Sequence, residues 1–499
     1  NGYPLKYNDW GCNSQLRDNI YINNTPNYIA ISGGTATENR TLFNDGIPYH
    51  VMGDITIYQN NGHPRITIEP VVTLAFALNT KLQIGINNGN YGGELYAEGK
   101  VDSIITFKPF NDATGGWGGI FIADPDNYGG TSSMKFCKIE KGAAYNIRYE
   151  NSSQPQLVHC EISQSSGVGL ELYSSSPIID SCIIRNSGLH GLVEQYSSAQ
   201  IHNCQFLNNN GYPLKYNDWS CNSHLLGNTW SGNTINYIAI AGGDYYEDRA
   251  FYNDGIGYHV LGNIRILQGG GHPRLTIKPG LTLAFQPGVS LQVGANGYGG
   301  ELFAEGTEDS LITFKPFNEV IGGWNGIYFN PYNDDYGGTS SMKYCKIEKG
   351  SSYNIAINGS TQPLLCYCEI NQSHGVGIQM DGGEPISITN CSISNSATYG
   401  LYANHFVGTL LNCTISNSGS HGMITSQSSG SIRNCQFLNN NGYPLKYEDW
   451  SCNTQLSGNT YIGNSPNCIA LSGGDYYENR TLYNDGIPYL VLNDIRLMQ

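Results

Sequence analysis

The chain carries little charge: Asp, Glu, Lys and Arg together make up only 13% of its 499 residues, against roughly 25% in an average globular protein. A disordered chain has many charges and few aromatic residues, so this composition excludes extended disorder. Long runs of Ala, Leu, Glu and Lys are also absent, which excludes long helices. Glycine and tyrosine are abundant instead, with 63 and 36 residues, and we interpret the chain as all-β.

Basic residues and long apolar runs are scarce as well. Twenty-five Lys and Arg residues against forty Asp and Glu give a formal net charge of -15, which repels phosphate backbones, so we expect no nucleic-acid partner. The longest apolar runs, such as Val71 to Leu78, fall far short of the roughly 20 residues that cross a bilayer, and we expect no membrane span. The sequence begins at Asn1 without a recognisable signal region, so an extracellular location is an inference.

A long segment recurs almost verbatim. Residues 1–10 read NGYPLKYNDW, residues 210–219 are identical, and residues 441–450 differ only at Glu448. The offsets of 209 and 231 residues define a large repeat over 1–209, a second over 210–440 and a partial third over 441–499, which we expect to form one continuous solenoid. The chain continues past two full repeats into a partial third copy. We therefore expect a longer array whose partners are neighbouring copies of itself, end to end or lateral.

A smaller repeat follows the cysteines. Nine of them are spaced by 22 or 23 residues: Cys137, Cys160, Cys182, Cys204, Cys345, Cys368, Cys391, Cys413 and Cys435. The second large repeat has one additional coil near residues 391–412. Apolar and polar residues alternate over three to five positions between Gly, Asn and Ser turns, which is typical of short strands. One coil cannot bury its inner face, so the coils must stack about 4.8 Å apart as a parallel β-helix.

Three segments of the second large repeat resemble a known family. LTIKPGLTLAF, GELFAEGTEDSLITF and GGWNGIYF (Gly322 to Phe329), followed by the Cys-x-Ile coils, resemble the right-handed parallel β-helix repeat proteins of bacterial surfaces, within the pectin-lyase-like superfold. The resemblance covers essentially the whole chain and implies a right-handed solenoid. That superfold includes pectate lyases, polygalacturonases, phage tailspikes, adhesins and inert stalks, so the resemblance does not assign a function.

The nine repeating cysteines are predicted to form a ladder of buried thiols on one inner edge. Cys366 occupies the place of Val158, and Cys468 that of Tyr28 and Tyr237, so thiols exchange with apolar groups within the chain. Occasional disulfides between neighbouring coils are the alternative, because the strand spacing suits them. We expect no zinc, because no CxxC pair occurs.

Asparagines accompany this ladder. They lie beside the cysteines or in the following turn, at Asn186, Asn203, Asn208, Asn390, Asn395, Asn412, Asn417 and Asn434. Asparagine tolerates left-handed turns, and stacked amides can bond from coil to coil, so we expect a structural ladder.

Catalytic groups are hard to find. The resemblance implies that an enzyme would carry a calcium-binding carboxylate cluster with an Arg or Lys base, or several Asp residues on adjacent coils. General acid–base chemistry needs such groups to converge on one substrate atom, and the cysteine coils carry almost no aligned Asp or Glu. His50 and His259 share their position with Leu490. We therefore expect no catalytic residues and no enzyme.

Two acidic loops supply candidate calcium ligands, and no other cofactor is expected. These candidates are Asp124, Asp126 and Asn127 in one large repeat and Asn333, Asp334 and Asp335 in the next. Calcium takes six to eight oxygen ligands, but the ligands shift by one residue between the copies, so a solvated loop is the alternative. Separately, Glu38, Arg40 and Asp45 recur in all three copies, which predicts a surface ion-pair cluster.

Aromatic residues provide the last functional signal. Trp117 and Trp324 are interpreted as covers of the core. Tyrosines in two Gly-Asp-Tyr-Tyr-Glu loops are candidate contacts for glycans or partner molecules: Tyr245, Tyr246, Tyr476 and Tyr477. Together these features predict a non-enzymatic extracellular structural rod that forms a filament, stalk or surface adhesin. A polyvalent glycan-binding surface protein and a polysaccharide lyase or hydrolase are the alternatives.

Overall fold

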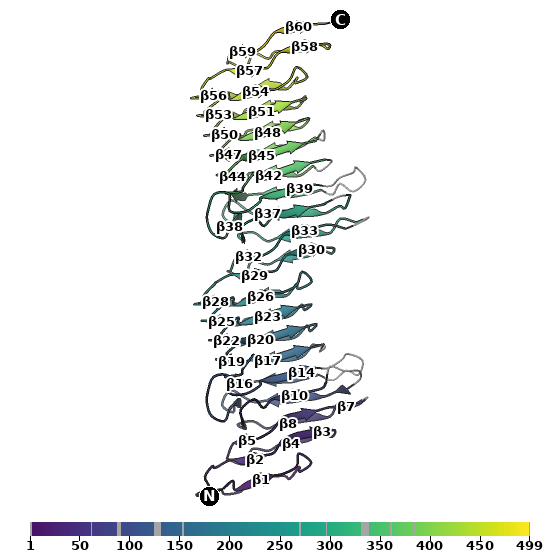
Figure 1. The fold of residues 1–499 in the computed structure, drawn as a ribbon, viewed down its shortest axis with the longest axis vertical. Helices are drawn as coiled ribbons and strands as arrows, with labels where there is room; N and C mark the ends of the chain where they lie inside the picture. Colours follow the sequence, from purple (N-terminus) through teal and green to yellow (C-terminus); the bar gives the residue numbers. More distant parts are fainter. Residues whose placement is uncertain are drawn as a thin grey trace. The chain divides into compact units, whose positions relative to one another are not determined.

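The computed structural model describes residues 2–60, 62–86, 91–123, 131–151, 154–268, 271–295, 297–330, 339–359, 362–382 and 385–498. These ranges contain strands and no helix. A helix able to cross a membrane is therefore also missing from this described part. The chain divides into unit 1, Asn1–Ala239 with Asp254–Ile256, and unit 2, Ile240–Asn253 with Gly257–Gln499. The prediction of an all-β parallel solenoid is confirmed within each unit (Figure 1).

Each coil of unit 1 contributes strands to three parallel sheets, named in the order in which the chain enters them after a ladder cysteine. The first sheet holds β1 (Leu5–Tyr7), β2 (Ile29–Ile31), β5 (Tyr49–Val51), β9 (Thr73–Phe76), β13 (Ile105–Pro109), β16 (Cys137–Glu140), β19 (Glu161–Ser163), β22 (Ile183–Arg185), β25 (Gln205–Leu207) and β28 (Thr229–Ser231). The second holds β3 (Gly34–Ala36), β6 (Ile55–Ile57), β10 (Leu82–Ile84), β14 (Ile120–Ala123), β17 (Tyr145–Glu150), β20 (Val168–Tyr173), β23 (Leu192–Gln195) and β26 (Leu214–Tyr216). The third holds β4 (Arg40–Leu42), β8 (Arg65–Ile68), β12 (Glu94–Glu98), β15 (Ser133–Lys135), β18 (Gln156–Val158), β21 (Ile178–Asp180), β24 (Gln200–His202) and β27 (His224–Leu226). A short antiparallel pair, β7 (Gln59–Asn60) with β11 (Tyr91–Gly92), lies outside these sheets, and β29 (Ile238–Ile240) crosses the division between the units.

Unit 2 repeats the arrangement. Its first sheet holds β32 (Tyr258–Val260), β35 (Thr282–Phe285), β38 (Ile312–Pro316), β41 (Cys345–Glu348), β44 (Glu369–Asn371), β47 (Ser392–Ser394), β50 (Thr414–Ser416), β53 (Gln436–Leu438) and β56 (Thr460–Ile462). The second holds β30 (Gly243–Tyr245), β33 (Ile264–Ile266), β36 (Leu291–Val293), β39 (Ile327–Phe329), β42 (Tyr353–Asn358), β45 (Val376–Asp381), β48 (Leu401–Asn404), β51 (Met423–Ser426), β54 (Leu445–Tyr447), β57 (Ile469–Leu471) and β59 (Tyr489–Val491). The third holds β31 (Arg249–Phe251), β34 (Arg274–Ile277), β37 (Glu301–Glu305), β40 (Ser341–Lys343), β43 (Leu364–Cys366), β46 (Ser387–Thr389), β49 (Thr409–Leu411), β52 (Ser431–Arg433) and β55 (Gln455–Ser457). A separate pair joins β58 (Gly474–Tyr476) to β60 (Ile495–Leu497).

Strict register places like side chains above one another in the core. Ile162 pairs with Ile184, which pairs with Phe206 on the next coil, and all three are fully buried. Strand alternation sends every second side chain inward, and each buried aliphatic or aromatic residue contributes about 1.5–3 kcal/mol of hydrophobic stabilisation. The apolar positions of the 22-residue repeat are therefore the core of each unit.

The boundary between the first two sequence repeats does not coincide with the division between the compact units. Strands on either side of Asn210 pair directly, since Gln205 of β25 lies opposite Thr229 of β28. The division into compact units comes near Ala239 instead. The sequence repeat therefore sets the phase of the coils without ending the stack.

Left-handed corners separate the strands. The eight asparagines named in the sequence analysis have φ angles of 53–54°, a region that Asn tolerates better than most residues. Asn412 Nδ2 donates to Asn390 Oδ1 on the coil before it at 3.1 Å. These asparagines thus shape the corners and in part bond between coils.

A second, inner amide ladder was not predicted. The buried Asn209 accepts a hydrogen bond from the Ser187 backbone amide at its Oδ1 (3.1 Å) and donates from Nδ2 to the Ile184 carbonyl (3.2 Å). Its own backbone amide donates to Asn233 Oδ1 on the next coil (3.1 Å). Asn440 and Asn464 repeat this arrangement in unit 2. Such bonds satisfy backbone groups that would otherwise be buried at the corner without a hydrogen-bond partner.

One inward position of unit 1 holds a carboxyl group. Glu194 on β23 is fully buried, and the Ser223 hydroxyl lies 2.8 and 2.6 Å from its two carboxyl oxygens. Burial raises the pKa of Glu194 from 4.5 to about 8. The equivalent residue of unit 2 is the buried Thr425. Glu194 therefore packs as a neutral acid at neutral pH.

Glu194 should make stability depend on pH. Because its folded pKa lies above its unfolded value, the folded state retains a proton that the unfolded chain releases, so stability falls as the pH rises from 4.5 towards 8, by about 1.4 kcal/mol for each pH unit crossed. Glu194→Gln should flatten this slope and be more stable than the native chain at pH 8. Chemical denaturation across this range measures it, with the surface variant Glu171→Gln as control. A Glu194→Gln variant with the native slope would contradict the assignment.

Candidate functional site

The cysteine ladder is an interior feature. All nine cysteines of the 22-residue repeat are buried, and all fourteen cysteines of the chain are free thiols in the structure. Cys182 is typical: its thiol lies 3.3 Å from the carbonyl oxygens of Leu157 and Asp180, and its sulfur accepts from the Cys160 amide at 3.4 Å. Each thiol thus takes part in the hydrogen bonding between coils.

Four ladder thiols of unit 2 have raised pKa values and are therefore poorly suited to chemistry: Cys368, Cys391, Cys413 and Cys435. The hydrogen bond with Cys391, together with burial, raises the pKa of Cys413 to about 12. A nucleophilic or metal-binding cysteine needs an accessible thiolate, which such a pKa opposes. The arrangement supports a structural ladder rather than a reactive one.

In the third copy of the predicted ion-pair cluster, the aspartate accepts hydrogen bonds at the end of the cysteine ladder, and the arginine bonds elsewhere. At the last coil of the ladder an asparagine replaces the next cysteine as the acceptor. The backbone amide of Cys435 donates to Asn459 Oδ1 at 2.8 Å. Asp485 Oδ2 then accepts from Asn459 Nδ2 (2.6 Å) and from the Tyr461 hydroxyl (2.8 Å). Arg480, its expected partner, donates to the Ser451 carbonyl. The ion-pair prediction was wrong for this third copy, because Asp485 accepts its hydrogen bonds from the preceding coil.

The candidate calcium ligands Asp124, Asp126, Asn127, Asn333, Asp334 and Asp335 lie outside the described residues. Carboxylates hold the chain just beyond them, since Glu94 Oε1 accepts from the Thr131 amide at 3.3 Å and Glu301 Oε1 from the Thr339 amide at 3.1 Å. Within the described ranges no three His, Cys, Asp or Glu side chains form a group that could hold a metal ion. Calcium binding stays a prediction.

The tyrosine loops divide into inward and outward residues. Tyr245 is only 2% exposed and lies beneath the Arg249 guanidinium, 5.1 Å from the ring centre, so its prediction as a contact residue was wrong. Alternation along β30 explains this, because Asp244 points outward and Tyr245 inward. Tyr246 is exposed by 42% and Tyr477 by 58%; Tyr476 is half-buried.

Tyr246 contacts an Asp–Arg ion pair, and Tyr477 follows the aspartate of a second such pair in the sequence. Arg265 Nε lies 2.5 Å from Asp244 Oδ1, and the Tyr246 hydroxyl donates to Asp244 Oδ2 at 3.1 Å. In the third repeat Arg496 Nε lies 2.6 Å from Asp475 Oδ1, two residues before Tyr477. An exposed ring beside a fixed hydrogen-bonding pair can stack on a sugar and bond its hydroxyls.

The other aromatic candidates are packing residues. Trp117 and Trp324 are fully buried, and their Nε1 groups donate to backbone carbonyls at 2.8 Å. His259 stacks on Phe317 with ring centres 3.6 Å apart, and burial lowers its pKa to about 4. His50 stacks on Phe110 in the same way. Buried neutral rings of this kind support packing rather than proton transfer.

One charged cluster on the outer face of the second sheet was missed. Arg148 on β17 lies 2.7 Å from Glu150 on the same strand and 3.5 Å from Glu171 on β20. Two carboxylates and an arginine on adjacent coils are the chemistry that an enzyme on this face would need. The matched positions of unit 2 hold Ala356, Asn358 and Gln379, so the cluster belongs to unit 1 alone.

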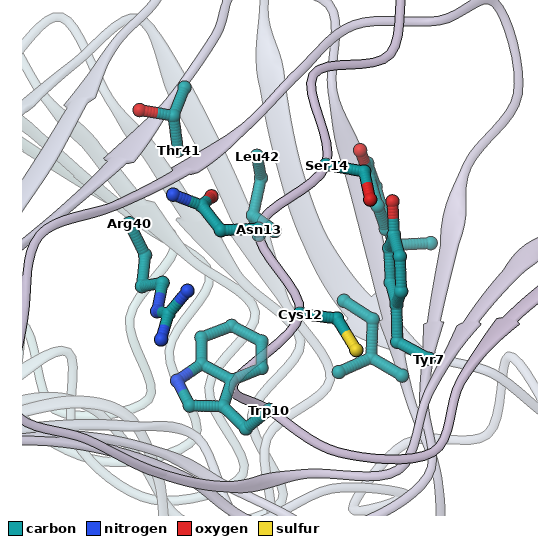
Figure 2. Close-up of a pocket in the computed structure, with 10 residues that line it drawn as sticks. Tyr7, Trp10, Cys12, Asn13, Ser14, Arg40, Thr41 and Leu42 are labelled. Carbon is teal, nitrogen blue, oxygen red and sulfur yellow. The ribbon is translucent and has the colours of Figure 1, made fainter.

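A small pocket lies between the first coils of unit 1. Figure 2 shows Tyr7, Trp10, Cys12 and Arg40 around it. Trp10 Nε1 and Arg40 Nε are buried there without a hydrogen-bond partner. The space admits no more than about one water molecule. Such a pocket can hold a bridging water but not a sugar.

The family comparison agrees with this architecture. Residues 86–250 and 325–485 match the family model described as right handed beta helix region. No curated protein sequence matches the chain.

Three solved structures align with most of the chain at low TM-scores. The catalytic domain of a GH87 α-1,3-glucanase is 13% identical, with 86% of this chain and 64% of that domain covered and a TM-score of 0.19. The PL6-family alginate lyase AlyGC is 10% identical, with 94% and 97% covered and a TM-score of 0.22. PfbA, a surface adhesin of Streptococcus pneumoniae, is 12% identical, with 86% and 85% covered and a TM-score of 0.17. At these values the likenesses carry no argument about function.

All fourteen thiols should be countable. The denatured, non-reduced protein is expected to react with a thiol reagent at all 14 cysteines, because the ladder sulfurs hydrogen-bond without bridging. In the native protein the nine ladder thiols should stay protected, whereas the exposed Cys12 should react first. The same count on a reduced sample is the control. Recovery of several fewer thiols before reduction would show disulfides between coils.

Proposed function

The chain belongs to the right-handed β-helix family, and on that premise we propose that it is a non-enzymatic structural protein of the cell exterior. In this proposal the stacked coils are a stiff scaffold for a filament, stalk or surface adhesin, and neighbouring copies of the chain are its expected partners. The exterior location follows from the scaffold role rather than from a signal in the sequence.

The observation that supports this proposal is the contrast between interior and surface. Matched coils of the two units repeat the buried thiols, as Cys160 and Cys368 illustrate, and repeat the buried indoles of Trp117 and Trp324. The charged cluster around Arg148 is not repeated. Features needed for stacking thus recur, whereas the group closest to a catalytic constellation does not.

The charges of that cluster also favour a structural role. Glu150 and Glu171 both face the Arg148 guanidinium, so each carboxylate is held in an ion pair. Acid–base catalysis needs one carboxyl poised to give a proton and another to take one. Two carboxylates bound to one cation are better suited to joining adjacent coils.

A polyvalent glycan-binding surface is the second candidate, supported by a different observation. The exposed Tyr246 and Tyr477 each accompany an Asp–Arg pair, at matched positions of two large repeats. In the first repeat Thr35, Thr37 and Thr56 take the corresponding places. A binder of this kind would have two equivalent contact points in unit 2.

A panel of acidic and neutral polysaccharides, with and without calcium, tests both candidates. We expect no new reducing ends or unsaturated products, because the Arg148 cluster has no free acid–base pair. Turnover that disappears in a Glu150→Gln, Glu171→Gln variant would contradict the scaffold proposal. Retention of one glycan that is lost in a Tyr246→Ala, Tyr477→Ala variant, but kept in the control Tyr367→Ala, would establish the second candidate.

A further inference from the structure

Two histidines meet on the outer face of the third sheet of unit 1. His202 Nε2 and His224 Nδ1 are 3.0 Å apart, and the planes of the two rings are nearly perpendicular, at 85°. His202 is half-buried and His224 is exposed, so solvent reaches the pair. The proposed scaffold role does not use it.

Strand register brings these residues together. β24 and β27 are neighbouring parallel strands in which Gln200 pairs with His224 and His202 with Leu226. Ile201 and Leu225, between them, point into the core. The two histidines are therefore diagonal neighbours on one face, fixed at their backbones by the sheet.

The separation of the two nitrogens suits chelation. A metal ion about 2.0–2.1 Å from each of two imidazole nitrogens holds them roughly 2.9–3.4 Å apart for ligand angles between square and tetrahedral. The distance of 3.0 Å in this pair lies within that interval. In this structure the two nitrogens share a hydrogen bond, and a metal ion would displace its proton to solvent and bind a lone pair of each ring.

We propose that His202 and His224 form a two-histidine site for a divalent transition-metal ion. Imidazole nitrogen suits Zn²⁺, Ni²⁺ and Cu²⁺. The site should bind Cu²⁺ more tightly than it binds Zn²⁺ or Ni²⁺. The described part of the chain places no third His, Cys, Asp or Glu side chain in such a group, so solvent completes the coordination. The result is an open, exchangeable site rather than a buried structural one.

The preceding strand of the sheet, β21, adds a favourable negative charge without adding a ligand. Asp180 of β21 lies opposite His202 in the register, and its Oδ1 accepts a hydrogen bond from Asn203 Nδ2 at 3.1 Å. A carboxylate one strand away lowers the cost of bringing a cation to the pair.

Unit 2 supplies an internal control. The same diagonal contact is made there by Arg433 and Gln455, with Nη2 of the arginine 3.3 Å from Oε1 of the glutamine. A guanidinium cannot bind a metal ion because it has no free lone pair and keeps its charge. The backbone arrangement is therefore present in both units, but only unit 1 has the ligands.

Calorimetric titration of the full, untagged chain with Ni²⁺ at neutral pH tests the proposal, since Ni²⁺ does not oxidise thiols. We expect one site in the native chain. Its Ni²⁺ affinity should fall at least about tenfold in His202→Asn and in His224→Asn, because the second imidazole acts at high effective concentration. The exposed His272→Asn is the control and should bind as the native chain does. Circular dichroism confirms that each variant is folded.

The matched positions allow the site to be transferred. Arg433→His together with Gln455→His should raise the stoichiometry from one Ni²⁺ to two. The proposal is overturned if the native chain binds no Ni²⁺, if His224→Asn binds it with native affinity, or if the transferred pair binds none.

Discussion

Hydrogen bonds between successive coils hold every other feature of this protein in place. Each strand pairs in register with the strand one coil away, as Ile184 does with Ile162 and Phe206. The corners are joined in the same direction, through thiols such as Cys182 and amides such as Asn209. Because these bonds run between equivalent positions of successive coils, a position accepts a residue that can extend the existing stack.

That constraint explains how much the sequence alone could predict. A period of 22 or 23 residues places like residues above like, so the burial of Cys182 and the left-handed backbone at Asn186 follow from spacing. No structural knowledge was needed for these features, because the neighbours of each residue are its own copies.

Other features depend on details that a period does not contain. Tyr245 points inward because strand alternation decides the face of each residue, and the sequence does not mark where β30 begins. The contact between His202 and His224 is diagonal, so it needs the register of two strands. Glu194 occupies a core position that composition alone would assign to an apolar residue. Sequence reasoning missed these features because they depend on single residues rather than on the repeat.

If each coil is an interchangeable module, a chain that lacks one complete coil should still fold. Removing residues 391–412 joins Asn390 to Cys413, and the two corner asparagines that frame the cut, Asn390 and Asn412, have matching φ angles of 54° and 53°. The shortened chain should fold and should unfold cooperatively with a midpoint close to that of the full chain, because β44 then meets β50 in the same register. Removing only 391–401 should abolish folding of unit 2. Loss of folding in the complete-coil deletion would show that the coils are not interchangeable.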